Sequence, residues 1–156
     1  MPAYSFKEQF VPFIIDGTKP HTIRARRNKG FAKEGSILYL YYGLRTKWCK
    51  KLREEICTKV QTIIISETDI WLCPDRLNDE DAQSMIDLFS EGTDISFHAK
   101  KLTRKEADLL AWKDGFRQEP TGVSSIGNFE IMLKFWKDTH QLPFIGDFIQ
   151  WCPKIK

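Results

Sequence analysis

The segment from Gly17 to Arg27, which reads GTKPHTIRARR, concentrates side chains that could do chemistry. Alternation along an extended strand places Thr22, Arg24 and Arg26 on one side. That basic side faces either solvent or a ligand, and a ligand there would be an anionic partner. The alternative is a solvated strand edge, where lysines and arginines discourage edge-to-edge pairing.

Basic residues are concentrated in the first part of the chain. Residues 1–60 contain 13 Lys and Arg against 5 Asp and Glu, whereas residues 61–156 contain 11 against 16. An asymmetry of this kind favours a polyanion or nucleotide partner at the basic end. A charge run that forms only a solvated face would give the same count.

A second cluster of cations interleaved with rings follows the apolar run at residues 37–42. Its members are Tyr42, Arg45, Lys47 and Trp48, with Lys50, Lys51 and Arg53 beyond them. Cations contact phosphates and exposed rings stack on bases, so the mixture suits a single strand or a flipped nucleotide better than a duplex groove. The alternative is that the tyrosines of this strand alternate into the core.

Composition and length predict one soluble globular domain. Of the 156 residues, 42% are hydrophobic and 29% charged, unlike a disordered chain. The apolar runs are too short to span a bilayer, and the first residues lack the charged and apolar regions of a signal peptide, so we expect a cytoplasmic protein that does not contact membrane. The four cysteines form no C-x-x-C pair and the three histidines have no metal-ligand spacing, so neither a metal nor another cofactor is expected.

Hydrophobic periodicity predicts an α+β fold. Strands are expected at residues 21–26, 37–42, 54–65 and 144–151, the last with a turn or bulge at Gly146–Asp147. Helices are expected at residues 7–15, 78–92, 103–115 and 128–140, with a capping box opening the third. Trp112, Trp136 and Trp151 fall on apolar faces and are expected in the core. Strands, then helices, then a closing strand favour a small β-barrel with flanking helices.

The string Gly17-x-Lys19-x-x-Thr22-Ile23-Arg24, after an apolar helix and before a Gly35-Ser36-Ile37-Leu38 strand entry, resembles the ASCH family, whose members adopt a PUA-like β-barrel. The fragments YYGLRTKWC, AWKDGF, FEIMLKFW and FIQW agree, so the resemblance covers most of the chain. Residues 69–100, approximately, resemble an insertion that shorter members lack. The chain is therefore expected to be a single ASCH, PUA-like domain over residues 1–156.

The resemblance also implies an activity and a set of site residues. The family is associated with recognition of nucleic acids and modified nucleosides, and some small bacterial members hydrolyse the amide of N4-acetylcytidine with a lysine, a threonine and a glutamate. The lysine and threonine correspond to Lys19 and Thr22. The glutamate would correspond to Asp114, which is one methylene shorter and so departs from the family pattern at a position where proton transfer needs hydrogen-bond reach.

Metal-free amide hydrolysis needs a nucleophile, an unprotonated base and donors for the developing oxyanion. Thr22 could be the nucleophile. Lys19 could be the base only if its pKa falls well below its reference value, which nearby Arg24 and Arg26 would favour and a nearby Asp114 would oppose.

Three functions follow as expectations. The first is binding of RNA, single-stranded nucleic acid or a modified nucleoside in a basic cleft, with contacts from Arg24, Arg26, Arg27, Tyr42, Arg45, Lys47 and Trp48. The second is a metal-independent amidohydrolase acting on N4-acylated cytidine through Lys19, Thr22 and Asp114. The third is a metal-independent ribonuclease that uses Lys19 and the arginines.

Overall fold

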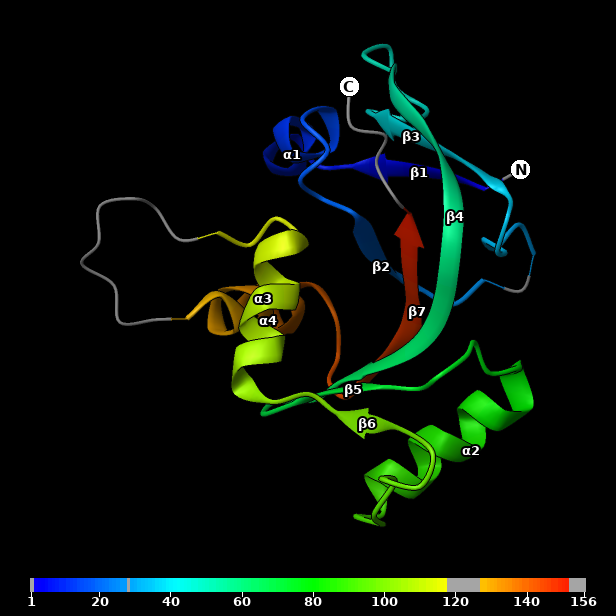
Figure 1. Cartoon of the computed structure of the whole chain (residues 1–156), viewed down its shortest axis with the longest axis vertical. Coiled ribbons are helices and arrows are strands. Elements are labelled where there is room, and N and C mark those ends of the chain that lie inside the picture. Colours follow the sequence, from blue (N-terminus) through cyan, green and yellow to red (C-terminus); the bar gives the residue numbers. More distant parts are fainter. Residues whose placement is uncertain (1, 28, 118–126, 152–156) are drawn as a thin grey trace.

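A computed structural model of the chain describes residues 2–27, 29–117 and 127–151, and these form a mixed α+β fold (Figure 1). The strands are β1 (Ala3–Phe6), β2 (His21–Ala25), β3 (Ile37–Tyr42), β4 (Lys50–Ile65), β5 (Ile70–Leu72), β6 (Lys100–Lys101) and β7 (Phe144–Trp151). The helices are α1 (Val11–Ile15), α2 (Asp79–Ser90), α3 (Arg104–Lys113) and α4 (Asn128–Thr139), with a 3-10 turn, η1 (Glu8–Phe10), before α1.

Most of the predicted elements are confirmed, with shifts of a few residues at their ends. The helix predicted at residues 7–15 is divided into η1 and α1. Pro12 lies in the first turn of α1, where its missing N–H removes no helical hydrogen bond. The capping box of α3 is present: the Thr103 side chain accepts from the Glu106 N–H and the Glu106 side chain accepts from the Thr103 N–H. The strands β1, β5 and β6 were not predicted.

The seven strands form one sheet that does not close. The main path runs β1-β3-β4-β5-β6, and β7 pairs with both β4 and β2. Only β1 and β3 pair in parallel; the other recorded pairs are antiparallel. The α+β class is therefore confirmed, whereas the closed barrel is not, because the recorded pairings leave β1, β2 and β6 with one strand partner each among the described residues.

The long strand β4 organises the sheet by bending along its length (Figure 1). Its first half pairs with β3 and its second half with β7 and β5, with an irregularity between Cys57 and Lys59. The bulge predicted at Gly146–Asp147 is wrong, because β7 keeps continuous register there with both neighbours. Gly146 instead allows close backbone approach: an added Cβ would lie 2.4 Å from the Arg24 carbonyl oxygen.

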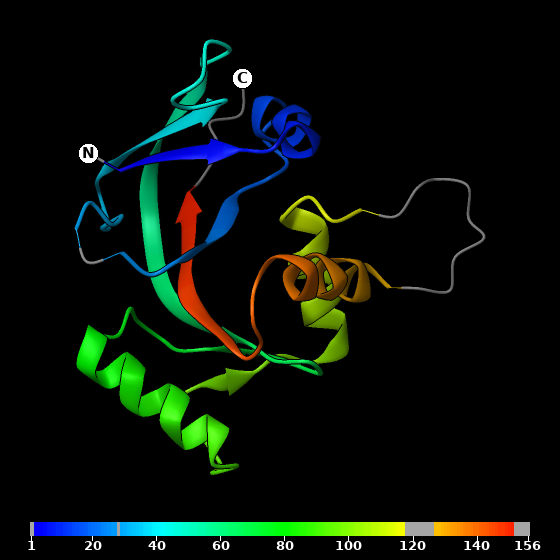
Figure 2. The same ribbon diagram turned by 180° about the vertical axis from the view of Figure 1, so that it is seen from behind.

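Two hydrophobic clusters divide the interior. The larger lies between the sheet and the helices α3 and α4, which share one side of the molecule (Figure 2). The smaller contains Ile64, Cys73, Met85, Ile95 and Ala99, and it joins α2 to the end of the sheet. Residues 69–100, where an insertion was expected, thus form β5, α2 and the first residue of β6, and they contribute most of the smaller core.

Candidate functional site

A pocket of about 440 Å³ lies among β1, β2, the end of α3 and α4. Its polar lining includes Lys19, Thr22 and Asp114, the three residues that the resemblance assigns to catalysis. The ring side chains in its lining are Phe6, Phe10, Phe116, Phe135, Trp136 and His140. The lining also includes Ser5, Lys7, Ile23, Arg24, Ala25, Arg26, Arg27 and Thr139. Four segments of the chain, within residues 5–10, 19–27, 114–116 and 135–140, therefore meet at one concave site.

The turn after α1 fixes the position of Lys19. The Asp16 side chain accepts hydrogen bonds from the N–H and the hydroxyl of Thr18, and the Lys19 N–H donates to the Phe13 carbonyl at 3.0 Å. Lys19 is only 2% exposed, and its ammonium lies 5.0 Å from the centre of the Phe10 ring. The chain thus directs a lysine inward, where burial of a charge is unfavourable unless it is paired.

Asp114 is the partner that compensates this buried charge. The Lys19 ammonium donates to Asp114 Oδ1 at 2.5 Å and to the Asp114 main-chain carbonyl at 2.7 Å. Asp114 is the C-cap of α3, so the ammonium also satisfies a carbonyl at a helix end and lies where the helix dipole favours a cation. The structure therefore brings Lys19 and Asp114 into direct contact across 95 residues of sequence.

Gly115 allows Asp114 to occupy this place. Its φ of +105° ends α3 in a conformation that other residues rarely adopt, and a Cβ there would lie 2.7 Å from the Phe10 ring. Arg117 then fastens the end of α3 to the turn before Lys19, because its guanidinium donates to the Trp112 carbonyl and to the Thr18 hydroxyl.

His21 is a third member of the buried polar group. Its Nδ1 lies 3.1 Å from Asp114 Oδ1 and its ring packs 4.6 Å from the ring of Phe148. Lys19 and His21 both contact Oδ1 of Asp114, and no hydrogen bond to Oδ2 is recorded within the described residues.

Burial dominates the electrostatics of this group. Burial lowers the pKa of Lys19 despite the opposing charge of Asp114, and Arg24 and Arg117 lower it further. Burial alone would raise the pKa of Asp114, but Lys19 and His21 hold it below its usual value. Burial also lowers the pKa of His21, so the ring is favoured in its neutral form and donates through Nδ1 to the carboxylate. Arg24 thus lowers the pKa of Lys19 as expected, but Arg26 is not among the causes of the shift, and desolvation has the largest effect.

Thr22 and Arg24 extend into the same pocket from β2. The Arg24 Nε donates to the Thr22 hydroxyl at 3.3 Å, and its Nη2 donates to the Ser5 carbonyl at 2.7 Å. Burial lowers the pKa of Arg24 to about 10. The hydroxyl, the carboxylate and the ammonium therefore share a single hollow with a desolvated guanidinium.

Arg26 and Arg27 line the pocket but differ in their partners. Arg26 lies beyond the end of β2, and its guanidinium lies 3.1 Å from Asp79 Oδ1 and 3.4 Å from Asp147 Oδ1. It therefore joins β2 to the region of α2. The Arg27 guanidinium lies 4.5 Å from the centre of the Tyr4 ring and 3.4 Å from the Ala3 carbonyl.

The second predicted cluster lies outside the pocket. Tyr42 is half-buried, whereas Arg45, Lys47 and Trp48 are exposed in the connection between β3 and β4. This connection projects beyond the sheet, away from α4 (Figures 1 and 2). The single cleft that was expected to include both clusters is therefore not formed in this structure.

Sequence reasoning missed the aromatic walls of the pocket. Phe6 belongs to the unpredicted strand β1, and Phe116 and Phe135 carry no motif that separates them from core residues. Trp136 and Trp151 are buried as predicted, but the prediction for Trp112 is wrong: it is 40% exposed and the Arg117 guanidinium covers its ring at 3.8 Å.

Comparisons with protein-family models, with curated proteins and with solved structures find no match for this chain. Within residues 2–27, 29–117 and 127–151, no group of three His, Cys, Asp or Glu side chains is placed to hold a metal ion. The helices in those ranges are all too short or too polar to cross a membrane.

Proposed function

We propose that this pocket binds one nucleoside unit, either free or as part of RNA, and that the chain is a member of the ASCH family. The observation that carries the proposal is the convergence of Lys19, Thr22 and Asp114 in a pocket of about 440 Å³. This size lies in the range of small-molecule sites, which commonly combine apolar walls with a few placed polar groups.

The polar groups offer a pattern that complements a cytosine edge. Asp114 Oδ2 can accept from an exocyclic amine, whereas the Lys19 ammonium and the Thr22 hydroxyl can donate to ring nitrogen and carbonyl acceptors. Carboxylates pair with the amine of cytosine in nucleic-acid recognition for the same reason. A cytidine, with or without a substituent on its amine, is therefore the proposed ligand.

The aromatic lining favours a flat ligand. Phe116 packs against Phe10 at 5.3 Å and against Phe135 at 5.1 Å between ring centres. Base stacking on such rings stabilises a bound nucleotide by about 1–3 kcal/mol per base. A base held here would be separated from its neighbours in a strand, as in proteins that recognise extruded bases.

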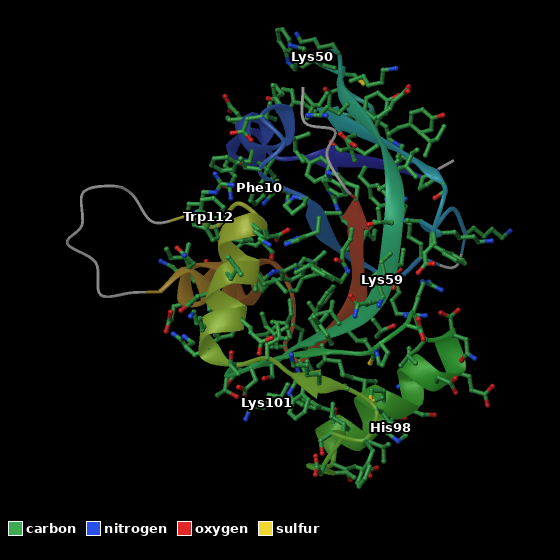
Figure 3. The ribbon with its side chains drawn as sticks, in the orientation of Figure 1. Phe10, Lys50, Lys59, His98, Lys101 and Trp112 are labelled. Atoms are coloured by element: carbon green, nitrogen blue, oxygen red, sulfur yellow. The ribbon has the colours of Figure 1, made fainter. Side chains whose placement is uncertain are left out.

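Calorimetric titration tests this proposal. Cytidine, N4-acetylcytidine, uridine and adenosine are titrated into the wild-type protein, a Thr22→Val variant and a Lys59→Met variant. Lys59 is exposed on β4 and serves as the control (Figure 3). We expect the cytidines to bind best, Thr22→Val to weaken binding at least tenfold and Lys59→Met to leave it unchanged; absence of binding by all four nucleosides would refute the proposal.

A second candidate function is hydrolysis of an N4-acylated cytidine, favoured by the lowered pKa of Lys19, which lines the same pocket as Thr22. Thr22 Oγ1 would attack the acyl carbonyl carbon while its proton passes to the neutral Lys19 amine. The C–N bond then breaks, and the cytosine amine takes that proton as it leaves. Water hydrolyses the acyl-threonine ester, which releases the carboxylic acid and restores the hydroxyl.

Release of cytidine and acetate from N4-acetylcytidine measures this activity. Thr22→Ser should retain turnover and Thr22→Val should abolish it. Turnover that persists in Thr22→Val would exclude the threonine as nucleophile. RNA cleavage assayed in chelator separates the ribonuclease alternative from both proposals.

A further inference from the structure

Two arginines of the pocket have no recorded carboxylate partner among the residues that the structure describes. Arg24 and Arg27 form no ion pair within 4.0 Å among the described residues, whereas Arg26, in the same segment, has two acidic partners. Both unpaired guanidiniums donate to carbonyls of β1, Arg24 to Ser5 and Arg27 to Ala3. Main-chain carbonyls orient a guanidinium but do not neutralise its charge.

The two guanidiniums are also neighbours. Both lie over the Tyr4 ring, at 5.4 Å for Arg24 and 4.5 Å for Arg27. Burial is the largest cause of the lowered pKa of Arg24; the charges of Asp114 and Tyr4 oppose it, and Arg27 lowers the pKa further. Like charges held together and partly desolvated are unfavourable in the empty pocket, and an anion between them would relieve that repulsion.

Hydrogen-bonding capacity remains for such an anion. An arginine carries five N–H donors, and only two of those of Arg24 have recorded acceptors among the described residues. Among the described residues, Asp114 is the only carboxylate that lines the pocket, and Lys19 already pairs with it. The lining therefore has a surplus of positive charge at the Arg24 and Arg27 side.

We propose that Arg24 and Arg27 form a phosphate subsite, so that the ligand of the pocket is a nucleotide rather than an uncharged nucleoside. This inference rests on the proposed function, because it assigns the base to the Lys19, Thr22 and Asp114 side of the same pocket. Guanidinium groups bind phosphate oxygens through paired, charge-assisted hydrogen bonds, which suits them to this role.

The test compares cytidine with its 3′- and 5′-monophosphates by calorimetry at low and at high salt. We expect one of the monophosphates to bind at least tenfold more tightly than cytidine, and expect this gain to shrink as salt rises. Arg24→Gln and Arg27→Gln should each reduce the gain severalfold. Lys59→Gln is the matched control and should preserve it.

The outcomes separate this inference from the function on which it rests. Equal affinity for cytidine and both monophosphates would overturn the phosphate subsite and leave nucleoside binding in place. Absence of binding by nucleoside and nucleotides alike would overturn both. Arg27→Gln keeps the test informative if Arg24→Gln fails to fold, because among the described residues the Arg27 side chain has one recorded acceptor and that of Arg24 has two.

Discussion

The pocket and the connection between β3 and β4 are both rich in cations and aromatic rings, but the fold buries the first and exposes the second. In the pocket, Lys19 is 2% exposed and its ammonium has two recorded acceptors on Asp114. In the connection, Trp48 is 68% exposed and Lys47 lies over its ring at 4.9 Å. Composition identifies basic segments, but tertiary packing decides which cations lose their water, and desolvated, coupled groups mark candidate functional sites.

The connection between β3 and β4 is organised by short-range contacts. Thr46 bonds with Gly43 and Trp48 within a few residues, and Lys50 lies at the outer end of the sheet (Figure 3). Its cations remain in water, where their contribution to affinity is long-range and sensitive to salt. The pocket instead holds its polar groups in fixed directions, as the proposed recognition of one base would require.

The largest expected effect comes from breaking the buried pair. Asp114→Ala leaves the Lys19 ammonium buried without a counter-charge, so we expect unfolding free energy to fall by about 3–5 kcal/mol. The exposed pair Lys51–Glu54 is the matched control, and Glu54→Ala should leave stability nearly unchanged. Urea denaturation at neutral pH measures both.

A double replacement sharpens the same comparison. In Lys19→Met with Asp114→Leu, both charges are removed and apolar volume is kept, so stability should recover to near that of the wild type while nucleoside binding stays lost. A double variant as unstable as Asp114→Ala would contradict the view that an uncompensated charge is the cause.

A change of pH is expected to have an intermediate effect on the free energy of unfolding. Burial lowers the pKa of His21 below its usual 6.5, so below about pH 6.5 the unfolded chain binds a proton that the folded ring resists. Stability should therefore fall on acidification from pH 7.5 to 5.5, by at most about 1.4 kcal/mol from this histidine, and Asp114 should add a further loss as pH falls below its usual pKa of 3.8. The neighbouring charges that act on His21 are Asp114, Lys19 and Lys113.

Denaturation midpoints at the two pH values measure this dependence. In His21→Gln the difference should shrink. His140, whose pKa is also lowered by burial and by Lys7 but which is more exposed, is the comparison. If His140→Gln removed more of the pH dependence than His21→Gln did, the buried group would not be its main source.

The smallest effect is expected at the connection between β3 and β4. Replacement of Arg45, Lys47 and Lys50 by glutamine should leave mononucleotide affinity unchanged within twofold. If RNA extends from the pocket to this connection, its binding should weaken, with a salt dependence reduced in proportion to the lost phosphate contacts. Titrations with cytidine monophosphate and a short RNA distinguish the two regions.

Local patterns predicted the parts of the fold that local physics determines. The spacing of apolar residues in α2 and α4 and the capping box of α3 are properties of short stretches of sequence, and the helices that they predict are confirmed. β6 is two lysines with no periodic signal, so only its pairing with β5 defines it. The prediction of a bulge at Gly146 is wrong because a glycine in a strand indicates either a bulge or close backbone approach, and this structure has the close approach.

Of the predicted site residues, those of the segment around β2 and Asp114 line the pocket, whereas Arg45, Lys47 and Trp48 do not, and the long-range contacts of the pocket were not predicted. Thr22 and Arg24 lie in β2 and Lys19 lies two residues before it, so their relative placement follows from local spacing. The bond from His21 to Asp114 crosses 93 residues, and the partners of Arg26 come from α2 and β7. No pattern in the sequence distinguishes Arg26, which forms ion pairs with Asp79 and Asp147, from Arg24 and Arg27, which form none among the described residues.

A crystal of this protein soaked with cytidine monophosphate tests the central claim most directly, because it locates the ligand. The account predicts the base between the aromatic rings, with its amine at Asp114 and its phosphate at Arg24 and Arg27. Density at the connection between β3 and β4, with an empty pocket in crystals whose pocket is open to solvent, would contradict it.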